Sequence, residues 1–347
     1  MKIAGISSDD IVRMAREIEF SGVVSLAPLG AGASLDLAFG YADRANRVPN
    51  NPETRFAMAS GCKSFTALAI GLLIDAGKVT LDTTLADCVR SRSFHFGEKV
   101  AVGQLLNHTS GVPDYFDEEV MHDFADLWKE RPCYGMKTIA DFLPMFEAGA
   151  MKAEPGSGFH YCNSGFILAG LVVEELTGRE FRDFVSERIF APCGMTRSGY
   201  FAMDALPDNS ALGYLSEMAS DLRTNVYAVP IIGGPDGGAF TTAADLRAFW
   251  SALLAERIVS RTTLETFLAP SVAATERGEA WLYGRGFWLR KNGESWVVSI
   301  EGFDPGVSLE SQVRRDEGIV VTVLSNTGDG AGTMAARLDA MIDAARR

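Results

Sequence analysis

A serine and a lysine stand three residues apart in Ser60-Gly61-Cys62-Lys63, at the start of an apolar stretch. On an α-helix, side chains at this spacing share one face and can reach each other. The N-terminus of such a helix leaves backbone N–H groups unpaired and carries partial positive charge, which would stabilise an oxyanion. Ser60 could act as a nucleophile if an uncharged Lys63, favoured by desolvation, takes its proton. The spacing alone also fits a serine that caps a helix.

A tyrosine and an asparagine follow a turn-rich segment, in Tyr161-Cys162-Asn163. Beside Lys63, a tyrosine would have its pKa lowered by the neighbouring cation and could pass a proton from Ser60 to a leaving group. Asn163 could hold Lys63 or a substrate amide. The structural alternative is a tyrosine that covers an interface and an asparagine that caps the next helix.

Two other polar segments are interpreted as structural. His108 could serve as a base for Ser60, but it stands in a Gly/Pro turn, where a hydrogen-bonded structural histidine is expected. Residues 237–242 with Asp245 form a glycine-rich turn that is expected to cap a helix. We therefore assign neither segment to catalysis.

The periodicity of apolar residues predicts the elements that must position these groups. Phe65, Leu68 and Leu72 recur at helical spacing, which predicts a helix over residues 60–76 that ends before Gly77. Residues 21–29 and 34–42 predict a hairpin, residues 81–254 are helix-rich, and residues 331–345 predict a closing amphipathic helix. Four further strands are expected over 286–290, 295–300, 307–314 and 318–325.

Strands at both ends and helices between them predict an α+β fold. We expect residues 1–80 and 255–347 to form one lobe, an antiparallel sheet flanked by the terminal helices. Residues 81–254 would form a helical insertion lobe, and the cleft between the lobes would be the ligand site.

Composition narrows the classes of partner. A net charge of −13, without a basic cluster, argues against nucleic acid and anionic membranes and leaves a small-molecule or short peptide-like substrate. No apolar run reaches membrane-spanning length, and the first residues do not read as a secretory signal, which predicts a cytoplasmic protein or a trimmed secreted one. The 5 cysteines and 4 histidines lack metal-ligand spacing, so we expect no metal, no cofactor and free buried thiols. The oligomeric state is not predicted.

Several segments, in order, resemble the superfamily of serine β-lactamases and penicillin-binding proteins, in particular its class C-like branch with DD-peptidases and esterases. The matching text is FAMASGCKSFTA, LLNHTSGVPDY, EPGSGFHYCNSGFILAGLVVEELTG, IFAPCGM, GGAFTTAADL, DPGVSLES and VVTVLSN. The resemblance runs from about residue 40 to residue 326 and implies a β-lactamase/transpeptidase-like fold.

The resemblance also implies roles for single residues. Ser60 corresponds to the nucleophile, Lys63 to its base and Tyr161 to the second-motif tyrosine, with Asn163 beside it. The N–H groups of Ser60 and Phe303 would form the oxyanion hole. Cys62 and Cys162 would lie near the site and serve in packing.

The third motif of the family departs from its pattern. Where the family has Lys or His, any residue, then Gly, this chain has Ile300-Glu301-Gly302. Either Ile300 or, after a one-residue loss, Glu301 replaces the cation. A carboxylate there would repel a substrate carboxylate by about 1–4 kcal/mol, so weak or no β-lactam hydrolysis is expected.

The resulting hypothesis is a serine hydrolase that cleaves an ester or amide bond through a Ser60 acyl-enzyme. Two alternatives stay open: an acyltransferase that uses the same acyl-enzyme, and a non-catalytic scaffold protein.

Overall fold

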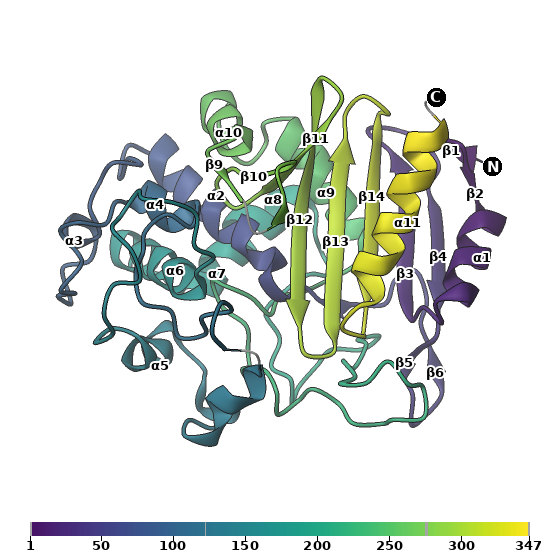
Figure 1. The fold of residues 1–347 in the computed structure, drawn as a ribbon, viewed down its shortest axis with the longest axis horizontal. Helices are drawn as coiled ribbons and strands as arrows, with labels where there is room; N and C mark the ends of the chain where they lie inside the picture. The colour runs from purple at the N-terminus through teal and green to yellow at the C-terminus, as the bar shows by residue number, and fades with distance from the viewer. Residues whose placement is uncertain (1, 122, 275–276, 346–347) are drawn as a thin grey trace.

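A single antiparallel sheet of eight strands forms the centre of the molecule in the computed structural model (Figure 1). The structure describes residues 2–121, 123–274 and 277–345. The strand order is β4-β3-β14-β13-β12-β11-β10-β9, so the two ends of the chain meet in one sheet. Its strands are β3 (Gly22–Pro28), β4 (Leu35–Phe39), β9 (Val272–Ala273), β10 (Trp281–Tyr283), β11 (Trp288–Asn292), β12 (Ser295–Asp304), β13 (Val307–Arg314) and β14 (Ile319–Ser325).

These strands confirm most of the predicted ones. The hairpin of β3 and β4 has its expected antiparallel pairing, and β13 has the predicted bounds. β12 runs to Asp304, four residues further than predicted, because the hairpin with β13 continues to the Asp304/Val307 pair. The short strands β9 and β10 were not predicted.

Alternation along the strands separates two apolar cores. Val24 of β3 and Val323 of β14 face the terminal helices α1 (Ser8–Glu17) and α11 (Gly330–Ala345), which cover one face of the sheet. Val23 and Leu324, one residue away on each strand, face the larger core on the other side. Successive side chains of a strand point to opposite faces, so nearly continuous apolar strands serve both layers.

Helices from the middle of the chain cover the second face. The helix α2 (Lys63–Asp75) is almost wholly buried and packs against α6 (Asn163–Thr177) and α10 (Arg261–Leu268). α9 (Ala243–Leu254) contacts β3 and β14, so the stretch before residue 254 also contributes to the sheet layer. Every helix in the described residues is too short or too polar to cross a lipid bilayer.

The remaining helical segments are α3 (Leu85–Cys88), α4 (Val102–Leu106), α5 (Ile139–Phe142), α7 (Phe181–Val185), α8 (Ala191–Cys193), the 3-10 turns η1 (Ala59–Cys62), η2 (Phe124–Lys129), η3 (Cys133–Gly135) and η4 (Leu143–Met145), and the π-helical η5 (Ser186–Phe190). Short strand pairs join β1 (Lys2–Ile3) to β2 (Ile6–Ser7), β5 (Tyr41–Asp43) to β6 (Val48–Pro49), and β7 (Phe56–Ala57) to β8 (Phe240–Thr241).

Candidate active site

Ser60 lies on a tight turn that precedes α2. The predicted α-helix begins with the 3-10 turn η1, a common form for the first turn of a helix. Ala59 has a φ of 45°, in the left-handed region that non-glycine residues rarely adopt. Its carbonyl accepts a hydrogen bond from the Gly238 N–H at 3.2 Å. The turn leaves the Ser60 N–H among the first groups of a helix, which have no intrahelical partner.

The Lys63 amine is buried beside the Ser60 hydroxyl. The side-chain nitrogen of Lys63 donates to Ser60 Oγ at 2.9 Å, to Asn163 Oδ1 at 2.8 Å and to the Asp236 carbonyl at 2.8 Å. Three acceptors use the three N–H groups of an ammonium. A neutral amine would keep its two N–H groups on the carbonyl oxygens and turn its lone pair toward Ser60. The same geometry therefore serves both protonation states of Lys63.

Asn163 is fixed at the start of α6 by a buried carboxylate. Asp114 Oδ2 accepts the Asn163 N–H, and Oδ1 accepts the Ser164 N–H, both at 2.8 Å. Burial raises the pKa of Asp114 to about 6, and the hydrogen bonds to Ser164 and Asn163 oppose that rise. This carboxylate takes two of the N–H groups that a helix start leaves unpaired, so it positions the amide that holds Lys63.

Asp236 is a site residue that the sequence reasoning did not identify. Its carbonyl holds Lys63, and its side-chain Oδ2 accepts a short hydrogen bond from the Tyr115 hydroxyl. Burial raises the pKa of Asp236, and Lys63 lowers it. The expected helix cap is present, because Thr242 Oγ accepts the Asp245 N–H at 3.1 Å. Asp236 directly precedes this segment, and the available signal for it is one acidic residue between the glycine pairs 233–234 and 237–238.

Tyr161 lies in the site as a neutral phenol. Burial and then Glu118 raise its pKa well above the usual value, while its hydrogen bond with Ser60 lowers it. The Lys63 nitrogen lies over the face of the ring, 5.0 Å from its centroid. The predicted lowering of this pKa by Lys63 is therefore wrong, because desolvation dominates. A protonated phenol beside Ser60 suits a proton donor better than a base.

His108 supports Tyr161, as expected for a structural residue. Its ring stacks on the Tyr161 ring with centroids 4.3 Å apart, and Nδ1 accepts the Cys162 N–H at 3.0 Å. Burial and Lys63 hold the pKa of His108 well below its usual value. The neutral ring thus fixes the position of Tyr161.

Cys62 and Cys162 pack within the protein, as predicted. Both thiols are buried and accept backbone N–H groups, from Ala239 at 3.1 Å and from Gly165 at 3.3 Å. Burial raises the pKa of Cys62 to about 12. A thiol with so high a pKa is a poor nucleophile at neutral pH.

The third-motif segment divides between the core and the cleft. Ile300 is 1% exposed and belongs to the apolar core, so the prediction that it binds substrate is wrong for this conformation. Glu301, on the other face of β12, lines a pocket together with Ser60 and Tyr161. Its Oε2 lies 2.6 Å from Nη1 of Arg277, a residue that sequence reasoning missed. Arg277 offsets the charge of Glu301, but Glu118, Glu310 and Asp329 line the same pocket. Weak or no β-lactam hydrolysis therefore stays a prediction.

Gly302 and Phe303 bring β12 against the serine turn. A Cβ on Gly302 would lie 2.1 Å from the Met58 carbonyl oxygen, so only glycine permits this approach. Asp304 pairs with Val307 around the two-residue turn, and Phe303 pairs with Ser308. Because hydrogen-bonded and non-hydrogen-bonded pairs alternate in antiparallel ladders, we expect the Phe303 N–H to point away from β13, toward Ser60.

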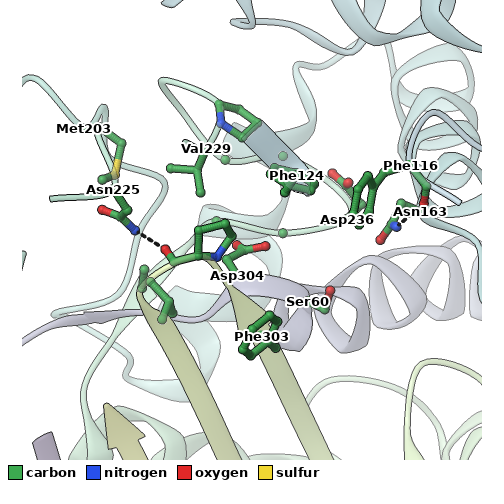
Figure 2. A pocket seen from close by; sticks show the side chains of 18 of the residues that line it. Ser60, Phe116, Phe124, Asn163, Met203, Asn225, Val229, Asp236, Phe303 and Asp304 are labelled. Carbon is green, nitrogen blue, oxygen red and sulfur yellow. Dashed lines mark hydrogen bonds between the residues drawn. The ribbon is translucent and has the colours of Figure 1, made fainter. Parts of the chain in front are cut away.

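Two pockets meet at Ser60. The first has a volume of about 510 Å³ and contains Asp236, Asp304 and the rings of Phe116 and Phe124 (Figure 2). The second, of about 430 Å³, extends past Tyr161 to Glu301 and Arg277. Both volumes are within the range that holds small ligands. An acyl donor bound at Ser60 could therefore extend into both pockets, with one part of its structure in each.

Comparison with known proteins gives relatives over most of the chain. A penicillin-binding protein of Bacillus subtilis (strain 168) is 30% identical over 84% of this chain and 64% of its own length. The D-aminopeptidase of Brucella anthropi is 28% identical over 91% of this chain and 58% of its own length. The chain thus spans less than two thirds of either relative.

Solved structures show the same fold. A penicillin-binding protein from Bacillus halodurans matches with a TM-score of 0.90 and 40% identity, over 95% of this chain and 99% of that chain. The D-amino acid amidase from Ochrobactrum anthropi SV3, complexed with L-phenylalanine amide, matches with a TM-score of 0.78 over 97% of this chain and 98% of that chain; at 24% identity it supports the fold alone. The predicted α+β fold and the predicted superfamily are confirmed. The family described as Beta-lactamase matches residues 13–346, and the chain belongs to that family.

Proposed function

We propose that this protein is a serine hydrolase that cleaves an amide or ester bond through an acyl-enzyme on Ser60. The observation that carries the proposal is the buried Lys63 nitrogen, 2.9 Å from Ser60 Oγ and held by two carbonyl oxygens. This arrangement suits a base that takes the serine proton without moving.

The proposed reaction uses the groups in turn. Ser60 Oγ gives its proton to Lys63 and bonds to the substrate carbonyl carbon, while the N–H groups of Ser60 and Phe303 stabilise the oxyanion. Tyr161 donates its proton to the leaving nitrogen or oxygen, the bond to the carbonyl carbon breaks, and Lys63 returns a proton to Tyr161. Water then repeats the sequence on the acyl-enzyme and releases the acid.

The first pocket favours an acyl group that carries an amine. Asp236, Asp304 and Glu118 line it, and its described lining residues include neither lysine nor arginine. Burial raises the pKa of Asp304 to about 7; Lys63 lowers it, and Asp236 and Glu118 raise it. A substrate ammonium would supply the positive charge that these carboxylates lack. Apolar rings in the same pocket, Phe116, Phe124 and Phe142, suit an apolar side chain next to that amine.

The name of one similar protein agrees with this substrate class, because that relative is a D-aminopeptidase. We therefore propose amides or esters of amino acids with a free amine and an apolar side chain as substrates. The enantiomer is left to the experiment.

The test compares phenylalanine p-nitroanilide with its N-acetyl derivative, in D and L forms. We expect kcat/KM to be at least about 10-fold higher for the free amine in one enantiomer, the size of one charge-assisted interaction. Ser60→Ala should abolish turnover, and Ser157→Ala, an exposed serine, should not. Equal rates for both derivatives would contradict the amine site, and turnover by Ser60→Ala would contradict the mechanism.

Location in the cytoplasm and a short peptide-like substrate stay predictions of the sequence.

A further inference from the structure

The two carbonyl oxygens that hold the Lys63 nitrogen come from distant parts of the chain. One belongs to the Asn163 side chain at the start of α6, and the other is the Asp236 backbone carbonyl, each 2.8 Å from Nζ. Figure 2 shows both residues near Ser60 in the first pocket. A base that is displaced by a fraction of its hydrogen-bond length loses much of its effect on the reacting group. The position of the amine therefore depends on whatever fixes these two oxygens relative to each other.

Asp114 and Tyr115, the last two residues of the segment LLNHTSGVPDY, each hold one of these acceptors. The Asp114 carboxylate accepts the N–H groups of Asn163 and Ser164. The Tyr115 hydroxyl donates a short hydrogen bond to Asp236 Oδ2. Ser164 joins the two halves, because its hydroxyl donates to Asp114 Oδ1 and accepts the Tyr115 N–H, both at 2.9 Å. One short segment thus connects the two residues that hold the lysine.

The contact with Tyr115 decides how the Asp236 peptide is oriented. The preceding residue is fixed from the other side, because the Pro235 carbonyl accepts a hydrogen bond from Thr66 Oγ1 at 2.5 Å. The Pro235 ring also packs against α6, where a Cβ on Gly170 would lie 2.1 Å from it. Among the described side chains, the Tyr115 hydroxyl alone donates to the Asp236 carboxylate. Both residues are buried, so water does not readily replace this donor.

We propose that Tyr115 is a positioning residue for Lys63, acting through the Asp236 carboxylate. With Asp114 it sets the distance between the two oxygens that hold the lysine nitrogen. This inference rests on the proposed function, in which Lys63 takes the Ser60 proton. With Asp236 in place, its carbonyl holds one N–H of the neutral amine, and the lone pair faces Ser60 Oγ. Without the Tyr115 hydroxyl, the Asp236 peptide is free to rotate, and the amine loses its fixed direction.

The test measures how fast a fluorophosphonate labels Ser60, because this reagent has no amine and does not use the proposed amine site. We expect Tyr115→Phe to lower the rate constant of labelling by about 10- to 100-fold, while labelling still goes to completion. The new ring keeps its contact with Phe142, whose ring centroid lies 5.3 Å from that of Tyr115. Tyr200→Phe is the control, because the buried Tyr200 hydroxyl has no hydrogen-bond partner in the described residues. This control should be labelled at the wild-type rate.

Variants of Asp236 separate positioning from charge. Asp236→Asn keeps a side-chain oxygen that can accept from Tyr115, whereas Asp236→Ala does not. We therefore expect Asp236→Asn to be labelled about 10-fold faster than Asp236→Ala. The double variant Tyr115→Phe/Asp236→Ala should be labelled as slowly as the slower single variant and no more slowly, because both changes remove the same hydrogen bond.

Three results would overturn the inference. The first is a wild-type rate constant in Tyr115→Phe, including incomplete labelling at that rate, which would show a loss of folded protein alone. The second is an equal rate in Asp236→Asn and Asp236→Ala, which would show that the charge of Asp236 matters and its contact with Tyr115 does not. The third is a double variant whose loss is the product of the two single losses. If Tyr115→Phe does not fold, the two Asp236 variants decide.

The same measurement separates this inference from the proposed function. If wild type is not labelled on Ser60, the proposed function fails. If wild type is labelled on Ser60 and Lys63→Ala is not, the proposed function stands, and the rate constants of the Tyr115 and Asp236 variants decide the positioning role alone.

Discussion

At the scale of single residues, the site depends on a buried amine whose hydrogen bonds need not change during proton transfer. Asn163 and Asp236 hold Lys63 from two sides, and Ser60 takes the third position. Tyr161 supplies the remaining proton as a neutral phenol, since burial raises its pKa well above the usual value. The spacing of Ser60 and Lys63 indicated their contact from the sequence, whereas Asp236 and Arg277 come from loops and carry no periodic signal.

We expect Tyr161→Phe to lower kcat by about 10²- to 10⁴-fold, the usual contribution of a positioned acid or base. The ring should keep its stacking on His108, so the fold should be unaffected. Tyr200→Phe is the matched control, because the Tyr200 hydroxyl is buried and has no hydrogen-bond partner in the described residues. Steady-state kinetics and circular dichroism of the two variants check this; an active Tyr161→Phe would remove the phenol from the mechanism.

Asp304 should make stability depend on pH. Burial raises the pKa of Asp304 in the folded protein to about 7 from its ordinary value of 3.8, so between these pH values the folded state binds the extra proton. Stability must then fall as pH rises through this window. At pH 8, Asp304→Asn should melt at a temperature about 2 °C or more above that of wild type. At pH 4, the two proteins should melt at the same temperature. Thermal unfolding measures this difference, with Asp204→Asn, at an exposed aspartate, as the control. A difference in melting temperature between Asp304→Asn and wild type that is the same at all pH values would contradict the prediction.

At the scale of elements, the site depends on the close approach of β12 to η1. The sequence predicts the strands 307–314 and 318–325 well, because the first alternates apolar with polar residues, the second is a nearly continuous apolar run, and both end near turn residues. It could not predict that β12 reaches Asp304, or that Ala59 adopts a positive φ, since both follow from tertiary pairing. The sequence likewise could not predict which face of β12 carries Ile300, because the register of β12 with β13 determines it.

Gly302→Ala tests this approach. Its Cβ would lie 2.1 Å from the Met58 carbonyl oxygen and 2.9 Å from the Gly61 nitrogen, so β12 must move away from Ser60. We expect the oxyanion hole to widen and kcat to fall by about 10²-fold or more. Gly332→Ala in α11, where a Cβ meets nothing within 4 Å, should instead stabilise the helix by about 0.5–1 kcal/mol. Retained activity in Gly302→Ala would show that β12 does not form the hole.

At the scale of the whole molecule, a buried polar network fastens the last helix to the sheet. Arg314 of β13 is fully buried; it donates to Asp339 of α11 at 2.7 Å and to Glu317 at 3.1 Å, and it also pairs with Asp343. The sequence predicts α11 as amphipathic but not this network, because the partners become neighbours only when the two ends of the chain meet in one sheet.

Arg314→Met should lower the free energy of unfolding by about 3–5 kcal/mol, because it removes the buried cation that Glu317, Asp339 and Asp343 share, although Asp339 keeps its ion pair with Arg290. The adjacent Arg315 is exposed, and Arg315→Met should change the free energy of unfolding by no more than about 0.5 kcal/mol. Urea denaturation of both variants checks the difference. Equal midpoints would show that apolar packing alone holds α11.

The central claim is that Ser60 is a nucleophile activated by Lys63. The most direct measurement is reaction with a fluorophosphonate, followed by proteolysis and mass spectrometry to locate the adduct. We predict a single adduct on Ser60 in wild type and none in Ser60→Ala or Lys63→Ala. An adduct on another residue, or undiminished labelling of Ser60 in Lys63→Ala, would contradict the account.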